Sequence, residues 1–469
     1  MPTATARRQM KLSMFLTGDG NYHLAGWRLS EDGERGHGGC DMRQWVEFGR
    51  TMERGKLDML FIADGGISGV NDIETLGLTS RIDRLDPVTI LSALAMTTRN
   101  LGLVSTISTT YHEPFNVART VASLDHVSGG RAGWNIVTTA SKDEAQNFGR
   151  TEHLPHGERY ERAEEFVDVV RGLWDSYEDD AFPRHKASGI YMDAAKVNFL
   201  NHRGRYFSVR GPLSVPRPPQ GHPILVQAGS SEPGINLSAR VADVMFTSQS
   251  SLPEAKAFYD KAKSRCDRFG RSPDDIKIMP GVLLFIGRTR EDAQEKYERL
   301  QSLIPIRLAL QRLSEGLGGI DLSGYALDAP MPDIAVNNVR VSSVESYASI
   351  ARREGLTLRQ TAMRAAAAKH HLTIIGSPAQ IADELESWFV NGAADGFNVL
   401  CSDVPGGLND FVDLVVPELQ RRGLFRQDYE GTMLRDNLGL SRPLLNEARV
   451  SAFSSEVDTG SREENALFK

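Results

Sequence analysis

Polar residues stand where several apolar runs of this sequence end, and they are the first sign of chemistry in it. The run FIAD ends on Asp64, LVSTIST contains Thr106, and GWNIVTT carries Asn135. The run ILVQ continues into AGSSEPG, which holds Ser230 and Ser231. This set contains one acid, no lysine and no arginine, so it suits hydrogen bonding to a large and mostly neutral heteroaromatic ligand.

The runs that carry these residues read as strands separated by helical patterns, which is typical of an α/β protein. Eight such strands connected by helices favour a (β/α)8 TIM barrel with insertion segments over an open sheet, and neither GxGxxG nor a Walker A sequence follows an early strand. In a parallel barrel the carboxyl ends of the strands share one mouth, so we expect the polar residues to ring that mouth. A flavin would fit there. The predicted strands are 11–16, 58–63, 101–105, 132–137, 224–227, 244–247, 276–286 and 397–401.

Two further segments have residues that could meet a ligand at this mouth. Backbone N–H groups of the AGSSEPG turn could bind a phosphate at a helix N-terminus, or its serines could simply cap the helix. His156 and Tyr160 lie at the start of the helical pattern that follows GWNIVTT. A tyrosine on the apolar stripe of a helix is more often a core residue. His23 and Trp27 follow the first strand and could line the same mouth.

Composition excludes several other classes of protein. The chain has 469 residues and a net charge of −7, and no basic stripe suggests nucleic-acid binding. No run is long and apolar enough to predict a membrane span or a signal peptide. The three cysteines are far apart and no HExxH occurs, so we expect no metal and a cytoplasmic location. No nucleophile elbow or acid pair is visible, which favours a reactive cofactor positioned by the protein.

The predicted organisation is one barrel domain with two insertions. Residues 1–9 read as a mobile arm, residues 10–442 as the barrel, and residues 443–469 as a tail. The insertions, at about 175–219 and 304–371, are longer than the usual connections of a barrel. Loops of this length commonly form lids, binding walls or contacts between subunits.

Seven stretches of the sequence resemble one known family. They are HLAGWR, ERGKLDMLFIADG, ASLDHVSGGRAGWNIVTTASKDEAQNFG, HGERYERAEEFV, ILVQAGSSEPG, and IIGSPAQIADELESWF with DGFNV. Together they resemble the flavin-dependent monooxygenases of the bacterial-luciferase-like superfamily, in the branch of nitrilotriacetate monooxygenase component A and dibenzothiophene-sulfone monooxygenase. The chain departs from the family's common pattern after the second strand, in ADGGISGVNDIETLGLTSRIDRLDP, so the resemblance does not identify the substrate.

The resemblance implies a two-component enzyme that uses FMN as FMNH2, supplied by a separate NAD(P)H:flavin reductase. Addition of O2 would give a peroxyflavin that oxygenates a small organic substrate, with cleavage of a C–S or C–N bond as the usual outcome. A homodimer or homotetramer is common among relatives. The resemblance places Asp64, Thr106 and Asn135 near the flavin ring. It places His156 and Tyr160 near the ribityl and phosphate groups, with Ser230 or Ser231 at the phosphate, and leaves His23 and Trp27 as candidates on the substrate side.

Two other interpretations stay open on the sequence alone. The same barrel could serve an F420-dependent oxidoreductase, because the polar mouth does not distinguish a flavin from a deazaflavin. A non-catalytic flavin-binding protein is also compatible with the mouth, although the long insertions speak against a simple store. Binding of reduced FMN and its reaction with O2 would separate these alternatives.

Overall fold

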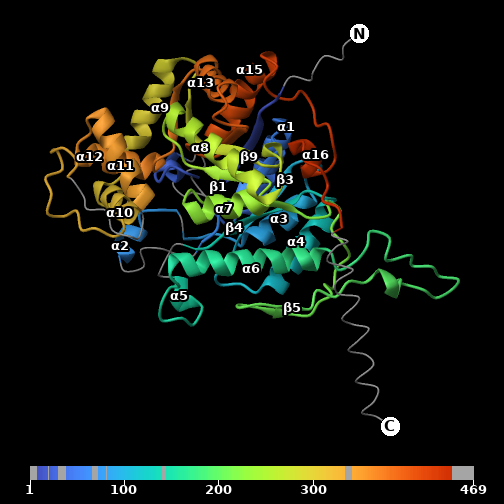
Figure 1. The fold of residues 1–469 in the computed structure, drawn as a ribbon. Coiled ribbons are helices and arrows are strands. Elements are labelled where there is room, and N and C mark those ends of the chain that lie inside the picture. Colours follow the sequence, from blue (N-terminus) through green and yellow to red (C-terminus); the bar gives the residue numbers. More distant parts are fainter. Residues whose placement is uncertain are drawn as a thin grey trace.

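Eight parallel strands close into a barrel, as the sequence predicts. The computed structural model describes residues 8–18, 21–29, 39–65, 72–80, 82–139, 144–332 and 341–445, and helices surround the strands (Figure 1). Each strand pairs in parallel with the next, and β9 with β11 and β11 with β1 complete the ring. The ring strands are β1 (Lys11–Leu16), β2 (Met59–Ile62), β3 (Gly102–Ser108), β4 (Ala132–Val137), β7 (Ile224–Gln227), β8 (Val244–Thr247), β9 (Lys277–Ile286) and β11 (Gly396–Cys401).

A ninth parallel strand, β10 (Leu372–Gly376), is the main feature that the sequence analysis missed. The long strand β9 pairs through Lys277–Pro280 with the short strand β8 and through Val282–Ile286 with β10. The apolar run of β10 follows a helical pattern, and no Gly, Pro, Asn or Asp separates the two. The sequence analysis therefore assigned no strand there. β10 therefore joins the second insertion to the barrel wall.

The helices lie where helical patterns separate the predicted strands. Several begin at a capped proline; for example, the Asp86 carboxylate accepts from the Thr89 N–H at the start of α3. Helix α4 ends at Gly129 with φ +68°, where a left-handed residue is needed to turn the chain into β4. The outer helices are α1 (Met42–Arg54), α3 (Pro87–Ala95), α4 (Pro114–Ser128), α6 (His156–Trp174), α7 (Glu232–Val241), α8 (Leu252–Arg265), α9 (Arg290–Ser302) and α13 (Pro378–Val390).

Shorter helical elements complete the described chain. They are η1 (Gly26–Leu29), α2 (Ile73–Leu76), α5 (Glu144–Asn147), η2 (Ala194–Lys196), η3 (Cys266–Phe269), η4 (Pro273–Asp275), α14 (Gly406–Asp410), η5 (Phe411–Val415), α15 (Val416–Arg421) and α16 (Leu434–Leu438). Among the described residues, no helix has both the length and the apolar character needed to cross a bilayer.

Each insertion forms structure of its own. In the first, strands β5 (His202–Arg203) and β6 (Ser208–Val209) form a hairpin that packs on α6, where Glu165 accepts from the backbone N–H groups of Tyr206 and Phe207. The second contains α10 (Ile306–Gly316), α11 (Val341–Glu354) and α12 (Leu358–Ala368), which form a group to one side of the barrel in Figure 1. Apolar residues of α10 and α12 continue the core of the barrel lumen outward.

Buried charge fixes the amino-terminal end of the barrel, opposite the mouth. Arg426 pairs with Asp58, and both Arg435 nitrogens reach Asp243 at 2.9 and 3.0 Å. Leu434 of α16 packs into the lumen, where a Cβ on Gly102 would lie 2.5 Å from it. The chain from residue 424 to 445 thus closes this end. The predicted arm and tail lie largely outside the described residues.

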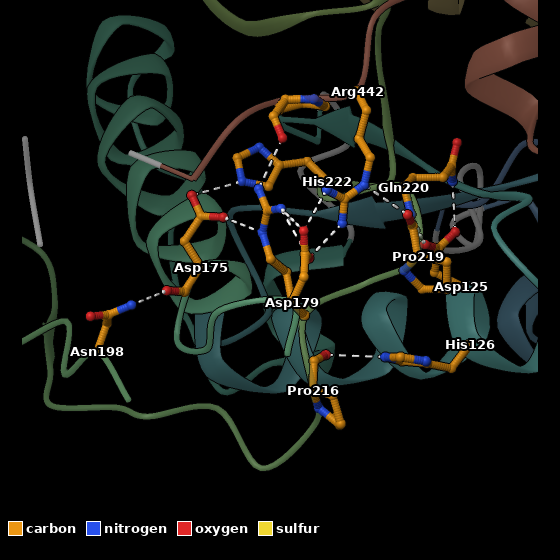
Figure 2. A network of polar contacts seen from close by, with 12 residues as sticks. Asp125, His126, Asp175, Asp179, Asn198, Pro216, Pro219, Gln220, His222 and Arg442 are labelled. Carbon is orange, nitrogen blue, oxygen red and sulfur yellow. Dashed lines mark hydrogen bonds and ion pairs between the residues drawn. The ribbon is translucent and has the colours of Figure 1, made fainter. Parts of the chain in front are cut away.

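A second network ties the last described residues to the first insertion (Figure 2). Asp175 accepts from both the buried His222 and Arg217, at 3.0 Å each. Asp179 accepts from Arg217 and also from Arg442 at 2.6 Å, so the two segments share one set of charges. The Arg217 guanidinium also donates to the Pro443 carbonyl at 2.9 Å.

We expect Gly281→Ala to destabilise the fold by about 1–3 kcal/mol, because overpacking of a filled core forces its neighbours to move. A Cβ at Gly281 of β9 would lie 2.6 Å from Nδ1 of His371 and 2.8 Å from Phe246. Urea unfolding followed by circular dichroism measures the change. Gly324→Ala is the control, since nothing lies within 4 Å of a Cβ there. Equal stability of the two variants would contradict the packing described here.

Candidate functional site

The polar tips of β3 and β4 face the barrel mouth from the inside. The Thr106 hydroxyl donates to the Ile62 carbonyl at 2.8 Å, and the Asn135 side-chain N–H donates to Thr106 Oγ1 at 3.0 Å. Asn135 Oδ1 is buried and has no hydrogen-bond donor in the described part of the chain. A buried acceptor left without a donor is costly unless a ligand or water supplies one. Asn135 is therefore poised to accept from a bound molecule.

The turn after β7 lies directly against Tyr160 of α6. A Cβ on Gly229 would lie 2.8 Å from the Tyr160 hydroxyl and 2.9 Å from the Cα of Gly234, so only glycine fits there. Ser231 is the N-cap of α7 and accepts from the Gly234 N–H at 3.4 Å. Ser230 Oγ lies 3.4 Å from the Thr247 hydroxyl. The structure thus brings Tyr160, Ser230 and Ser231 together, although they come from two different strand–helix connections.

His156 begins α6 and lies beside Tyr160, with their ring centroids 5.0 Å apart. The pKa of His156 is lowered, first because surrounding protein displaces water and second because the Arg159 guanidinium is close. Tyr160 is buried, whereas the His156 ring is exposed. A neutral imidazole and a phenol hydroxyl therefore stand at the entrance of the same helix.

Asp64 is at the mouth directly after β2. Its carboxyl is exposed toward the mouth, yet the protein around it displaces enough water to raise its pKa. The Gly65 N–H and the Arg84 guanidinium oppose this rise. A carboxyl with a raised pKa at the carboxyl end of a barrel strand is a frequent property of functional sites.

His23 and Trp27 lie on the opposite side of the mouth from the Gly229 turn, in the connection after β1. His23 is buried, accepts from the Ala25 N–H at 3.2 Å and packs edge-on against Phe285. The buried Trp27 indole N–H has no acceptor in the described part of the chain. Phe285 also lines a cavity of about 620 Å³, whose other lining residues include Leu29, Leu300, Arg299 and Asp403.

The sequence did not predict a set of hydrogen bonds that joins the connections after β3 and β4. His153 Nε2 contacts the Thr139 carbonyl at 3.1 Å, and its Nδ1 lies 2.7 Å from the Tyr111 hydroxyl. Thr139 has φ +46°, a strained conformation for a β-branched residue. The only signal in the sequence is the close spacing of His153 and His156, which does not by itself indicate this contact. In the described part of the chain, no group of three or more His, Cys, Asp or Glu could hold a metal ion.

The barrel and its mouth define a ligand-binding site of the kind that enzymes build at the carboxyl ends of parallel strands. The family model of luciferase-like monooxygenases matches residues 23–396. The chain belongs to the luciferase-like monooxygenase family, as the sequence predicts.

Individual relatives cover nearly the whole chain. Nitrilotriacetate monooxygenase component A of Aminobacter aminovorans is 48% identical over 95% of this chain and 100% of its own length. Dibenzothiophene-sulfone monooxygenase of Rhodococcus erythropolis is 40% identical over 94% of this chain and 99% of its own. The crystal structure of a riboflavin lyase with a modified FMN and its substrate riboflavin superposes with a TM-score of 0.81, at 31% identity, over 94% of this chain and 98% of that one.

We expect Gly229→Ala to weaken the binding of a ligand that occupies this turn by at least about tenfold, because the added methyl displaces Tyr160 or opens the turn. Anaerobic titration with reduced FMN measures the effect. The control is again Gly324→Ala, because nothing lies within 4 Å of a Cβ there. Another open glycine, Gly270, is unsuitable because its φ of +66° makes any side chain strained. Unchanged binding in Gly229→Ala would show that the turn does not contribute to the site.

Proposed function

We propose that this protein is the oxygenase of a two-component monooxygenase that binds FMN in its reduced form, FMNH2. A separate NAD(P)H:flavin reductase would supply the FMNH2. The observation that carries the proposal is the placement of the unpaired Asn135 acceptor and the Gly229 turn against Tyr160 on one mouth. FMN has a flavin ring at one end and a phosphate at the other. The Asn135 acceptor suits an N–H of the ring, and the glycine turn, with its hydroxyls and backbone donors, suits the phosphate. The name of the relative called component A supports a second component.

The residues present match the hydrogen-bonding groups of this cofactor. Asn135 and Thr106 would meet the ring system, with Asp64 close to its edge. Tyr160 and the serines Ser230 and Ser231 would hold the phosphate, and His156 would contact the ribityl chain. When bound, the reduced flavin supplies the activation of O2 for insertion of one oxygen atom into a substrate. The chain itself binds and orients the flavin and excludes water.

We propose that the substrate is a small organic molecule, oxygenated with cleavage of a C–S or C–N bond. His23 and Trp27 are placed to form its wall, because they lie on the far side of the mouth from the phosphate turn. The second insertion contributes to this side: Arg307 of α10 pairs with Asp72 at 2.8 Å and with Glu74 at 2.9 Å, next to and within α2. These pairs link the insertion to the connection after β2. Residues 66–71 of that connection lie outside the described residues.

We also propose a homodimer or homotetramer in the cytoplasm. Met96 and Val127, on the neighbouring helices α3 and α4, are 75% and 51% exposed, which suits contact with a second subunit. All three cysteines are free thiols, as expected in a reducing compartment. Light scattering of the purified protein measures the assembly.

The test of the proposed function is an anaerobic titration with photoreduced FMN, beside oxidised FMN and F420. We expect tight binding of reduced FMN and weak binding of the other two ligands. With a flavin reductase, NADH and O2, the complex should oxygenate a thioether or tertiary amine. Preference for F420, or tight binding of oxidised FMN with no oxygen chemistry, would contradict the proposal.

We expect Tyr160→Phe and Asp64→Ala each to weaken the binding of reduced FMN by about tenfold, because each removes a polar group that contacts a charged or polar part of the ligand. Tyr206→Phe removes a matched hydroxyl, which belongs to the hairpin of the first insertion and donates to the exposed Glu161 carboxylate of α6, and should leave binding unchanged. Unaltered affinity in both site variants would refute the assignment of these residues.

We expect Arg307→Gln to speed the reoxidation of bound reduced flavin by O2 up to about fivefold, because the exposed pairs that link α10 to α2 are worth at most about 1 kcal/mol. Stopped-flow absorbance measures the rate. Arg359→Gln breaks another exposed pair of the same insertion, with Asp328, and is the control. A similar change in both variants would argue against a specific role of the Arg307 pairs that link α10 to α2.

A further inference from the structure

Arg159 is a half-buried cation with almost no partners in the first turn of α6. One of its nitrogens donates to the Leu154 carbonyl at 3.3 Å, and its Nε is buried without an acceptor in the described part of the chain. No described carboxylate forms an ion pair with it. The hydroxyls of Tyr160 and Tyr111 are close enough to affect its pKa, so the guanidinium lies near the start of α6 and the connection after β3.

Other buried arginines of this protein have partners that Arg159 lacks. Arg435 reaches both oxygens of Asp243, and Arg131 makes five hydrogen bonds to carbonyl and hydroxyl oxygens near the amino-terminal end of the barrel. Arg162 also has one nitrogen without an acceptor in the described part of the chain, but its guanidinium lies over the Phe207 ring, 4.6 Å from the centroid. Removal of water from a guanidinium costs free energy that such partners offset. Loss of water lowers the pKa of Arg159, and no described carboxylate offsets this cost. A bound anion would supply the partner.

The position of Arg159 identifies the chemistry of that anion. Tyr160, the next residue, has its hydroxyl beside the Gly229 turn. His156, one helical turn earlier, is close enough for its pKa to be lowered by Arg159. The guanidinium therefore stands at the same helix end as the groups that we assign to the phosphate. A guanidinium presents parallel N–H donors that match the oxygens of a phosphate better than those of a neutral group.

We propose that Arg159 binds the phosphate monoester of FMN and makes the protein select FMN over riboflavin. This inference rests on the proposed function, since it assigns a residue to the same cofactor site. Riboflavin ends in a neutral hydroxyl at that position, so it offers no counter-charge to the guanidinium. Arg159 is thus a specificity-determining residue that discriminates between two flavins with identical rings.

A second arginine nearby provides a matched control. The Arg150 guanidinium lies over the Tyr111 ring at 5.7 Å from its centroid, and it forms no ion pair with a described carboxylate. It carries the same charge as Arg159 close to the same tyrosine. Its substitution therefore separates a direct contact with phosphate from a general effect of positive charge around the mouth.

The experiment is an anaerobic titration of the full-length chain with photoreduced FMN and photoreduced riboflavin, followed by absorbance. The wild type should bind FMN more tightly. Arg159→Gln should lose about 10- to 100-fold in affinity for reduced FMN and less than about threefold for reduced riboflavin. Arg159→Lys, which keeps the charge but not the paired donors, should lose less for FMN than Arg159→Gln. Arg150→Gln should change either affinity by less than about threefold.

Several outcomes would overturn the inference. One is an equal loss of affinity for both flavins in Arg159→Gln, which would leave the preference for FMN unchanged. Another is a loss of affinity for FMN in Arg150→Gln that equals the loss in Arg159→Gln. Inorganic phosphate that competes with reduced riboflavin as strongly as with FMN would also overturn it, because the anion site would then not belong to the bound flavin. A wild type that binds both reduced flavins equally overturns this inference alone. A wild type that binds neither overturns the proposed function.

Circular dichroism and thermal unfolding establish that the variants are folded. Arg159 lies in the first turn of α6 and has one hydrogen bond to lose, so we expect an unfolding temperature close to that of the wild type. Arg159→Lys is the second variant if Arg159→Gln is unstable. Equal FMN affinity in a folded Arg159→Lys and a folded Arg150→Gln, both at the wild-type level, would count against the paired contact.

Discussion

Closure of one end of the barrel by buried ion pairs is the constraint on which the rest of the structure depends. Asp58 and Asp243 precede β2 and β8, and each is matched by an arginine from the last part of the described chain, Arg426 and Arg435. Loss of one partner from such a pair leaves an uncompensated charge, which typically costs about 3–5 kcal/mol. The lumen is filled from this side by Leu434, so the opposite end is free to carry unpaired polar atoms.

The kind of unpaired atom differs between the two ends of the barrel. At the closed end Arg435 Nε and Arg426 Nη1 are buried without partners in the described part of the chain, but other nitrogens of the same guanidiniums reach Asp243 and Asp58. At the mouth Asn135 Oδ1, the Trp27 indole and Arg159 Nε are buried without partners in the described part of the chain, and no ion pair to a described residue accompanies any of them. Buried polar atoms that the fold leaves open in this way indicate where a ligand is expected.

The sequence predicted the barrel because each ring strand is an apolar run of its own, bounded by helix signals. It predicted the polar residues of the mouth because strand ends share one edge in this fold. It could not predict that Tyr160 touches Gly229, since the contact joins two connections that are about 70 residues apart in the chain and depends on how α6 and α7 pack. Arg159 was also missed, because a lone arginine in a helical pattern usually reads as a solvated surface residue. β10 was missed because the turn before it is made by Lys369, His370 and His371 and contains no Gly, Pro, Asn or Asp.

The double pairing of β9 has a mechanical consequence. β10 continues the line of β8 along the outer half of β9, so one end of the second insertion is part of the sheet. Five parallel register positions hold that end, whereas the other end enters through the short connection at Leu303, Ile304 and Pro305. The insertion is therefore anchored in the sheet at β10 and joined to α9 at its other end by three residues. The ion pairs of Arg307 with Asp72 and Glu74 add a third attachment, so a load on the connection after β2 is carried through α10 into the barrel wall.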